Sequence, residues 1–234
     1  MSDFNLTTVA VIRSCYKQKF GIPRQSGLCK SSEAIIEFVP PYNHEDYVRE
    51  LEDFSHLWVV FIFHRHLNKD VKATVRPPRL GGNKRIGVFA SRSSFRPNPV
   101  GLSVVKLNKI TNNNGKIELL VSGADLLDGT PVLDIKPYIK YADAVTDAYS
   151  SYADTRPEDD TLSVEFSDQS LSMLDSYIDK YPKLKSIITE TLSLDPRPAY
   201  QNDNEREYGL TLFDLNIKWI VTDNSARVIL IEPL

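Results

Sequence analysis

Several residue types and patterns are scarce in this chain, and their absence narrows its class. Only two cysteines, Cys15 and Cys29, occur in 234 residues, and with no export signal at the N-terminus we expect both thiols to be reduced. The longest uninterrupted apolar run, 57–63, is too short to span a bilayer as a helix. With 41% hydrophobic residues, the composition is typical of a globular protein, and we expect a cytoplasmic one.

Common cofactor and nucleophile motifs are also missing. The sequence contains neither the Gly-x-Gly-x-x-Gly dinucleotide motif nor a P-loop. Its four histidines and two cysteines show no zinc-ligand spacing, and no Gly-x-Ser-x-Gly nucleophile elbow is present. If the protein is an enzyme, it belongs to none of these common types, and we expect no metal.

Acidic residues are absent from 71 to 117, a stretch that we call the basic window. The basic window carries a formal charge of +10, so the rest of the chain carries −13 of the total of −3. A basic segment without internal carboxylates is the electrostatic footprint expected for an anionic partner such as RNA. The near-neutral total therefore conceals a strongly basic middle.

Two loops of the basic window, 76–83 and 91–101, combine arginine with proline. Proline restricts its own φ and the conformation of the preceding residue, so these guanidinium groups lose little freedom on binding. The guanidinium fork suits phosphate or carboxylate, which favours an anion-binding surface. The competing interpretation is that individual arginines donate to carbonyls or pair with acids from elsewhere in the fold.

The fold class follows from short apolar runs bounded by Pro, Gly, Asn or Ser. Many short strands with few helical patterns between them predict a barrel or sandwich rather than a doubly wound parallel sheet. We expect these strands at 8–13, 34–39, 57–63, 85–90, 102–107 and 116–122.

The C-terminal part contains both helical and strand patterns of apolar residues. A strand at 162–166 is followed by a first helix, for which Ser167 is the N-cap. A second helix at 182–194 ends at an Asp-Pro pair. Apolar residues then alternate strictly from 213 to 221, which indicates a hairpin. The chain is thus predicted to be mainly β with an α+β C-terminal part, namely a β-barrel at 1–145, a linker at 146–160 and a small α+β domain at 161–234.

Four shorter segments contain residue types found in binding loops. Residues 23–27 join a proline, a guanidinium fork, an amide and a glycine, while 126–131 alone is better interpreted as a simple hairpin turn. Residues 195–200 hold an arginine between two prolines, and the alternative there is a helix stop with a surface turn. Residues 64–66 follow the most apolar strand, where histidines at a barrel rim are favoured over a metal site.

Together these segments resemble the TrmO family of tRNA adenine-N6 methyltransferases, also called YaeB or TsaA-like. The resemblance covers essentially the whole chain and rests on linked motifs at 12–14 with 17–25, 54–58, 74–82, 87–101, 125–131 with 134–138, and 195–200. It implies a β-barrel that binds S-adenosylmethionine without a Rossmann fold, usually at or near a homodimer interface. It also implies methylation of the exocyclic nitrogen of N6-threonylcarbamoyladenosine, next to the anticodon of threonine tRNA.

The resemblance also assigns roles to residues, position by position. The implied cofactor-binding residues are Pro23, Arg24, Gln25, His64, Arg65, Arg92, Leu102, Asp128, Gly129, Thr130 and Pro131. The implied catalytic residues beside the target base are Asp195, Arg197 and Tyr200, with Asp195 or Tyr200 as the base. Five other basic residues of the basic window are left as candidates for tRNA phosphates, namely Arg76, Arg79, Lys84, Arg85 and Arg96.

The chemistry of the implied reaction agrees with these residue types. The cofactor carboxylate needs donors, and its ribose diol needs an acceptor such as Asp128. Because methyl transfer requires in-line approach, most of the catalysis should come from positioning. An alternative of a different class is a non-catalytic RNA- or nucleotide-binding β-barrel that keeps the same loops. A hydrolase acting on a phosphorylated metabolite is more distant, because no nucleophile or metal set is visible.

Overall fold

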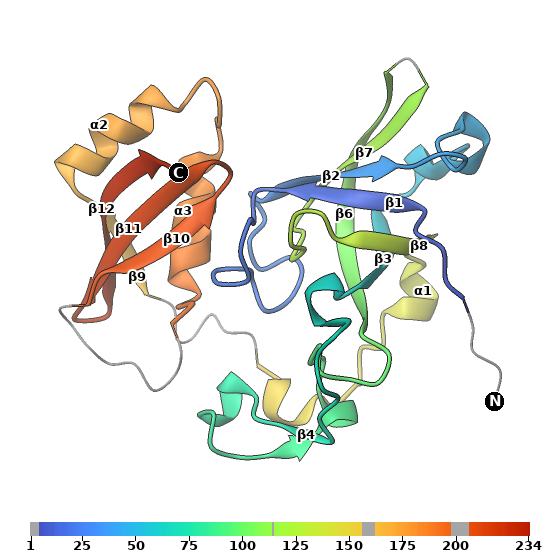
Figure 1. The fold of residues 1–234 in the computed structure, drawn as a ribbon, viewed down its shortest axis with the longest axis horizontal. Helices are drawn as coiled ribbons and strands as arrows, with labels where there is room; N and C mark the ends of the chain where they lie inside the picture. Colours follow the sequence, from blue (N-terminus) through green and yellow to red (C-terminus); the bar gives the residue numbers. More distant parts are fainter. Residues whose placement is uncertain (1–4, 114, 156–161, 198–205) are drawn as a thin grey trace.

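The N-terminal half forms a closed antiparallel β-barrel (Figure 1). The computed structural model describes residues 5–113, 115–155, 162–197 and 206–234. Its barrel strands follow the order β1-β2-β7-β6-β3-β8. They are β1 (Ala10–Ser14), β2 (Glu33–Phe38), β3 (His56–Ile62), β6 (Val100–Asn113), β7 (Lys116–Ser122) and β8 (Pro131–Pro137).

Strict alternation of side chains fills the barrel. In β3, Leu57, Val59 and Phe61 are buried, whereas the residues between them are only partly buried. Since successive side chains of a strand point to opposite faces, each strand contributes one row to the barrel interior. The interior therefore holds one continuous apolar core made from all six strands.

An excursion between β3 and β6 carries most of the basic window, at the bottom of Figure 1. It contains a short hairpin of β4 (Thr74–Val75) and β5 (Ile86–Gly87). Short 3-10 turns complete it at η3 (His64–His66), η4 (Pro78–Leu80) and η5 (Val88–Ala90). Further short turns elsewhere are η1 (Glu45–Tyr47), η2 (Leu51–Asp53), α1 (Lys140–Asp143) and η6 (Ser151–Ala153).

The C-terminal part packs two helices on a four-stranded sheet of order β10-β11-β12-β9. Its strands are β9 (Ser163–Phe166), β10 (Tyr208–Leu212), β11 (Leu215–Thr222) and β12 (Ser225–Pro233), with β9 parallel to β12. Helix α2 (Asp168–Ser176) begins at Ser167, whose hydroxyl accepts the Ser170 N–H. Helix α3 (Leu184–Ser193) buries its apolar face in the same core.

Residues 15–32, which we call the joining segment, connect β1 to β2 and pack into the C-terminal core. Cys15, Tyr16 and Cys29 are buried in that core, and both cysteines are free thiols. Burial raises the pKa of Cys15 to about 12, so this thiol is no nucleophile at neutral pH. The joining segment therefore connects two strands of the barrel while its side chains pack in the core of the C-terminal part.

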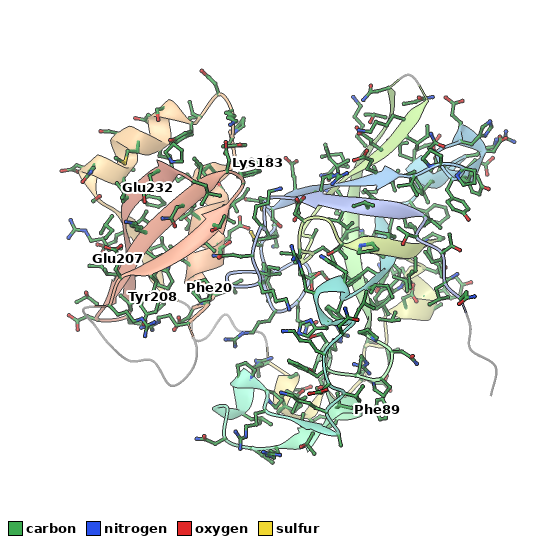
Figure 2. The ribbon with its side chains drawn as sticks, viewed as in Figure 1. Phe20, Phe89, Lys183, Glu207, Tyr208 and Glu232 are labelled. Atoms are coloured by element: carbon green, nitrogen blue, oxygen red, sulfur yellow. The ribbon has the colours of Figure 1, made fainter. Side chains whose placement is uncertain are left out.

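Polar contacts fasten the joining segment and β2 to helix α3. The Glu190 carboxylate accepts the N–H of Ser31 at 2.9 Å and its hydroxyl at 2.5 Å. Lys183, labelled between the two units in Figure 2, donates to Glu33 at 2.7 Å. The C-terminal part thus holds the segment that carries Pro23, Arg24 and Gln25.

The predicted fold class is confirmed, and so is the N-cap at Ser167. The strand predicted at 85–90 is wrong beyond Gly87, because the Ser91 N–H and hydroxyl both donate to the Val88 carbonyl and close a turn. Strand β8 escaped the prediction because polar Asp134 and Lys136 interrupt its apolar pattern. None of the described helices is long and apolar enough to cross a membrane.

Candidate functional site

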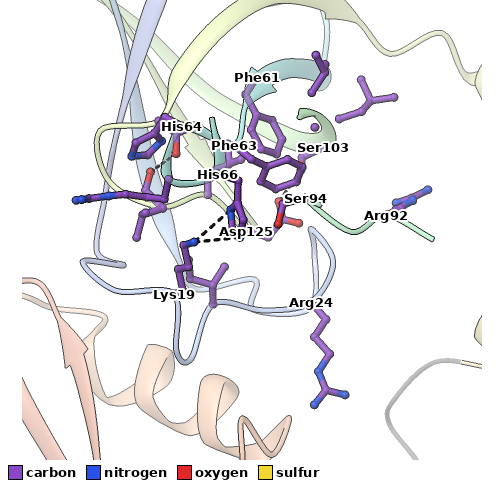
Figure 3. A pocket seen from close by; sticks show the side chains of 18 of the residues that line it. Lys19, Arg24, Phe61, Phe63, His64, His66, Arg92, Ser94, Ser103 and Asp125 are labelled. Atoms are coloured by element: carbon purple, nitrogen blue, oxygen red, sulfur yellow. Dashed lines mark hydrogen bonds between the residues drawn. The ribbon is translucent and has the colours of Figure 1, made fainter. Parts of the chain in front are cut away.

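A cavity of about 480 Å³ opens at the barrel rim, between β3, β6 and the joining segment (Figure 3). We call it the barrel cavity. Phe61 and Phe63 form an aromatic wall, with ring centroids 5.0 Å apart in an edge-to-face arrangement. Gly101 makes room for this wall, since a Cβ there would lie 2.2 Å from the Phe61 ring. An apolar slot with a few polar groups is typical of a small-molecule site.

Most of the predicted cofactor residues meet at the barrel cavity. Those that line it are Pro23, Arg24, Gln25, His64, Arg65, Arg92, Leu102 and Thr130. Arg92 donates to the side-chain oxygen of Gln25 at 2.6 Å, which joins the 91–101 loop to the joining segment. Residues that lie far apart in the sequence are thereby brought to one rim.

Asp128, Gly129 and Pro131 do not line the barrel cavity of a single chain. The Asp128 carboxylate accepts the Ser14 N–H at 2.9 Å and lies 2.8 Å from the Lys17 ammonium. The Gly129 N–H donates to the Ile12 carbonyl at 2.8 Å. In the single chain these contacts hold the 128–131 turn against β1 and the residues after it.

Asp125 lines the barrel cavity and was missed by the sequence analysis. Its carboxylate accepts the Ser103 hydroxyl at 2.6 Å. Burial raises the pKa of Asp125, while the Ser103 hydrogen bond and the positive charge of Arg92 oppose that rise. A mostly buried carboxylate in a cavity is suited to a cationic ligand. The only sequence signal was its place at the start of the 125–131 motif.

Basic side chains also line the barrel cavity, among them Lys19 and Arg65. Lys19 lies 3.2 Å from the Nδ1 of His66, a contact drawn dashed in Figure 3. Burial, followed by the charges of Arg65 and Lys19, lowers the pKa of His64, and burial also lowers that of His66. These shifts favour the neutral form of both imidazoles. Within the parts of the chain that the structure describes, no group of His, Cys, Asp or Glu is arranged to hold a metal.

A second cavity, of about 610 Å³, lies between the joining segment, the 76–83 loop and the end of α3. We call it the interdomain cavity. Arg76 and Arg197 line it, and so do several residues that also line the barrel cavity, namely Lys19, Ile22, Pro23 and Arg24. The two cavities are therefore separated by a single stretch of chain.

The proposed tRNA contacts fall into two groups. Arg79 donates to the Thr155 carbonyl at 2.5 Å, and Arg96 donates to the Ser91 carbonyl at 3.1 Å while lining the barrel cavity. Both arginines thus donate to a carbonyl, but neither pairs with an acid among the described residues, so their charges stay available to an anion. Lys84 and Arg85 are exposed. Among ion pairs between described residues, Lys116 is the only cation of the basic window that pairs with an acid. The positive charge of the basic window is therefore largely uncompensated.

The Asp195–Arg197 segment is more ordered than a simple helix stop. Asp195 has a φ of 43°, in the left-handed region. Its two oxygens accept from the Arg197 Nε at 2.8 Å and Nη2 at 2.9 Å, and this pairing raises the pKa of Arg197. The pair lies at the interdomain cavity through Arg197. Tyr200 lies outside the described residues.

Comparison with known proteins gives matches along the whole chain. The family model of the tRNA-methyltransferase O N-terminal domain matches residues 11–144, and that of the TrmO C-terminal domain matches residues 159–234. A "tRNA (adenine(37)-N6)-methyltransferase" of Escherichia coli is 46% identical, with 100% of both chains covered. A "Putative S-adenosylmethionine-dependent methyltransferase RcsF" of Pseudomonas aeruginosa is 42% identical over 92% of this chain and 91% of the relative. The crystal structure of TrmO from Pseudomonas aeruginosa superposes with a TM-score of 0.83 at 35% identity, covering 99% of each chain.

The barrel, its rim cavity and these matches define a methyltransferase that depends on S-adenosylmethionine. The chain belongs to the tRNA-methyltransferase O family. The resemblance and the class of enzyme predicted from the sequence are therefore confirmed.

Proposed function

We propose that this protein methylates the N6 nitrogen of N6-threonylcarbamoyladenosine, next to the anticodon of threonine tRNA. Methylation of N6 of adenine 37 in tRNA is supported by the family and by the full-length relative from Escherichia coli. The modified base and the threonine tRNA are our finer assignment. The observation that carries the proposal is a cofactor-sized cavity on a barrel flanked by uncompensated basic loops.

The barrel cavity fits S-adenosylmethionine by the chemistry of its walls. Phe61 and Phe63 offer apolar faces to an adenine, and Asp125 offers a carboxylate to the positive charges of the cofactor. Arg92, tied to Gln25, offers donors to its carboxylate. When bound there, the cofactor supplies an electrophilic methyl group.

The chain's own residues act by positioning the target. We place the cofactor site in a barrel domain over 1–145 and the target-base site in a domain over 161–234, joined by 146–160. Arg79, Lys84 and Arg85 bind phosphates of the anticodon arm, where a base of the loop can unstack. Because both Asp195 oxygens accept from Arg197, Asp195 orients that arginine beside the base. Asp195 and Tyr200 stay the candidates for proton removal.

The decisive experiment is methyl transfer with matched tRNA substrates. The protein is incubated with labelled S-adenosylmethionine and with threonine tRNA that carries or lacks the threonylcarbamoyl group, and the labelled nucleoside is identified by mass spectrometry. Label is expected only in the modified tRNA. Cofactor and tRNA binding without any transfer would support the non-catalytic RNA-binding barrel instead.

Neutralising the exposed basic loop should change the salt dependence of tRNA binding. With Arg79, Lys84 and Arg85 replaced by glutamine, the slope of log K against log salt should become less steep by roughly 2. Each lost phosphate contact reduces the magnitude of this slope by about 0.7–0.9. Cofactor affinity should stay unchanged. The matched control is Arg227→Gln, an exposed arginine on β12. Equal slopes for the triple variant and this control would contradict the assignment.

We also propose a homodimer in which a second copy covers the outer face of β3 and β6. Trp58, Val60 and Ile62 point outward there, opposite Val104, Leu102 and Val100 of β6. Leu102 is 50% exposed and also lines the barrel cavity, so a copy seated on this face would adjoin the cofactor site. Such a copy would also explain cofactor roles for Asp128, Gly129 and Pro131, which a single chain does not bring to its own cavity.

A charge placed on this face should separate the dimer. Val60→Glu is expected to give a monomer by light scattering and to weaken cofactor binding, because burying an unpaired carboxylate in an interface is unfavourable. The control is Ser122→Glu on the outer face of β7. A wild-type monomer at micromolar concentration would refute the dimer.

A further inference from the structure

The interdomain cavity is a second site, distinct from the barrel cavity to which we assign the cofactor. It is enclosed by three separate parts of the chain, the joining segment around 19–24, the loop around 76–83 and residues 191–197. Each part is fixed in place, by packing on the C-terminal core, by proline or by the Asp195–Arg197 pair. Preorganised walls of this kind are typical of a recognition site.

The charged groups that line the interdomain cavity are all basic. They are Lys19, Arg24, Arg76 and Arg197, and no Asp or Glu is among the described residues that line it. Figure 3 shows the Arg24 side chain pointing away from Phe61 and Phe63, on the far side of the segment from the aromatic wall. Arg24 thus contributes charge on the side away from the cofactor slot. The cavity is suited to an anion.

Thr191 gives a second, independent indication of a ligand. This residue of α3 lines the interdomain cavity and is 1% exposed. Its hydroxyl has no hydrogen-bond partner among the described residues. A buried hydroxyl left without a partner costs about 1–3 kcal/mol, which a polar ligand in the cavity would relieve.

The cavity also has apolar walls, from Ile22, Pro78, Leu194 and Pro196. A nucleic-acid phosphate is met by open basic surface, as at Lys84 and Arg85, and has no apolar part to bury. An amino-acid side group joins a carboxylate, a hydroxyl and a methyl within a few ångströms. The mixed basic and apolar lining of the interdomain cavity therefore suits an amino-acid carboxylate better than a phosphate.

From this geometry we propose that the interdomain cavity binds the carboxylate-bearing amino-acyl group on the target base and is the element that selects modified over plain adenine. The inference rests on the proposed function. Since Lys19, Pro23 and Arg24 line both cavities, the amino-acyl group sits one chain segment from the cofactor while N6, its point of attachment, faces the methyl group. Unmodified adenine would leave the interdomain cavity empty and the donors of the cavity unpaired. The enzyme should therefore discriminate against unmodified adenine as a substrate.

The test compares two substrates that differ only in the anion. Anticodon stem-loops carry either the threonylcarbamoyl group or its carboxamide analogue, in which the carboxylate is neutral. Wild-type kcat/KM should be on the order of 100-fold higher for the carboxylate, since a site built to bond a polar substrate group rejects an analogue that lacks it by at least this factor. Arg76→Gln should reduce kcat/KM for the carboxylate by about 30-fold or more and change that for the carboxamide by less than about threefold. Arg76→Lys should recover part of the preference.

Arg79→Gln, on the same loop but outside the cavity lining, is the matched control and should lower both substrates by one common factor. An equal loss for both substrates in Arg76→Gln would overturn the proposal and make Arg76 a phosphate contact. Equal rates of wild-type protein on both substrates would overturn it without any variant. Absence of transfer to the carboxylate substrate would instead refute the proposed function itself, so the two failures are distinguishable.

Discussion

Replacing Asp125 by asparagine is expected to weaken S-adenosylmethionine binding by roughly 100-fold, or about 3 kcal/mol, which is typical for removing one partner of a buried charge pair. Asp125 is the mostly buried carboxylate of the barrel cavity, and asparagine keeps its shape while removing its charge. Isothermal titration calorimetry measures the change. A loss below about threefold would show that the cationic part of the cofactor lies elsewhere.

The same variant should stabilise the ligand-free protein, which separates binding from folding. Burial raises the pKa of Asp125 in the folded state, so its contribution to stability is fully present below the ordinary carboxyl pKa and is lost as pH rises through the raised value. Above that raised pKa, the ionised, buried carboxylate is therefore unfavourable until a cation joins it. Urea unfolding at pH 7 should show Asp125→Asn to be at least as stable as wild type.

Cofactor affinity of the wild type should rise with pH over the interval in which Asp125 ionises, and Asp125→Asn should abolish that rise. Ser103→Ala provides a matched second variant, because its hydroxyl donates to Asp125 and lowers the pKa of that group. Its loss should move the midpoint of the rise to higher pH. A pH profile identical in all three proteins would show that another group governs binding.

Replacing Gly21 by alanine is expected to lower the free energy of unfolding by about 2–5 kcal/mol, through left-handed backbone strain and overpacking together. Gly21 has a φ of +84°, and an added Cβ would lie 2.2 Å from the Leu210 Cδ1 of β10. Because Gly21 stands in the stretch that lines the interdomain cavity and is followed by Pro23 and Arg24, cofactor affinity should fall as well. Urea unfolding and calorimetry report the two effects.

Gly27→Ala is the matched control for this experiment. Gly27 lies in the same joining segment with a φ of +75°, but an added Cβ would meet nothing within 4 Å. It should therefore show the backbone strain alone, about 1–2 kcal/mol. Equal destabilisation by the two variants would mean that the joining segment yields freely and is not held by the C-terminal core.

Local pattern was enough to predict some elements and not others. Short apolar runs bounded by turn residues located β3 and β7 almost to the residue, and a capping serine located the start of α2. The partners of each strand carry no such signal, because β3 pairs with both β6 and β8 across long stretches of chain. Asp125 was missed for the same reason, since its importance comes from Ser103 and the cavity and not from its neighbours in sequence.

The sequence by itself determined the class of protein, the mainly β fold, the family motifs and the uneven charge hidden behind a total of −3. These are local or compositional properties, and they do not depend on which distant residues meet. Only the tertiary structure decided that the joining segment is anchored in the C-terminal core, that Asp125 faces the barrel cavity, and that four basic residues surround a second cavity beside it. Each of those features arises from contacts between segments far apart in the chain, formed when apolar surfaces of both units are buried together.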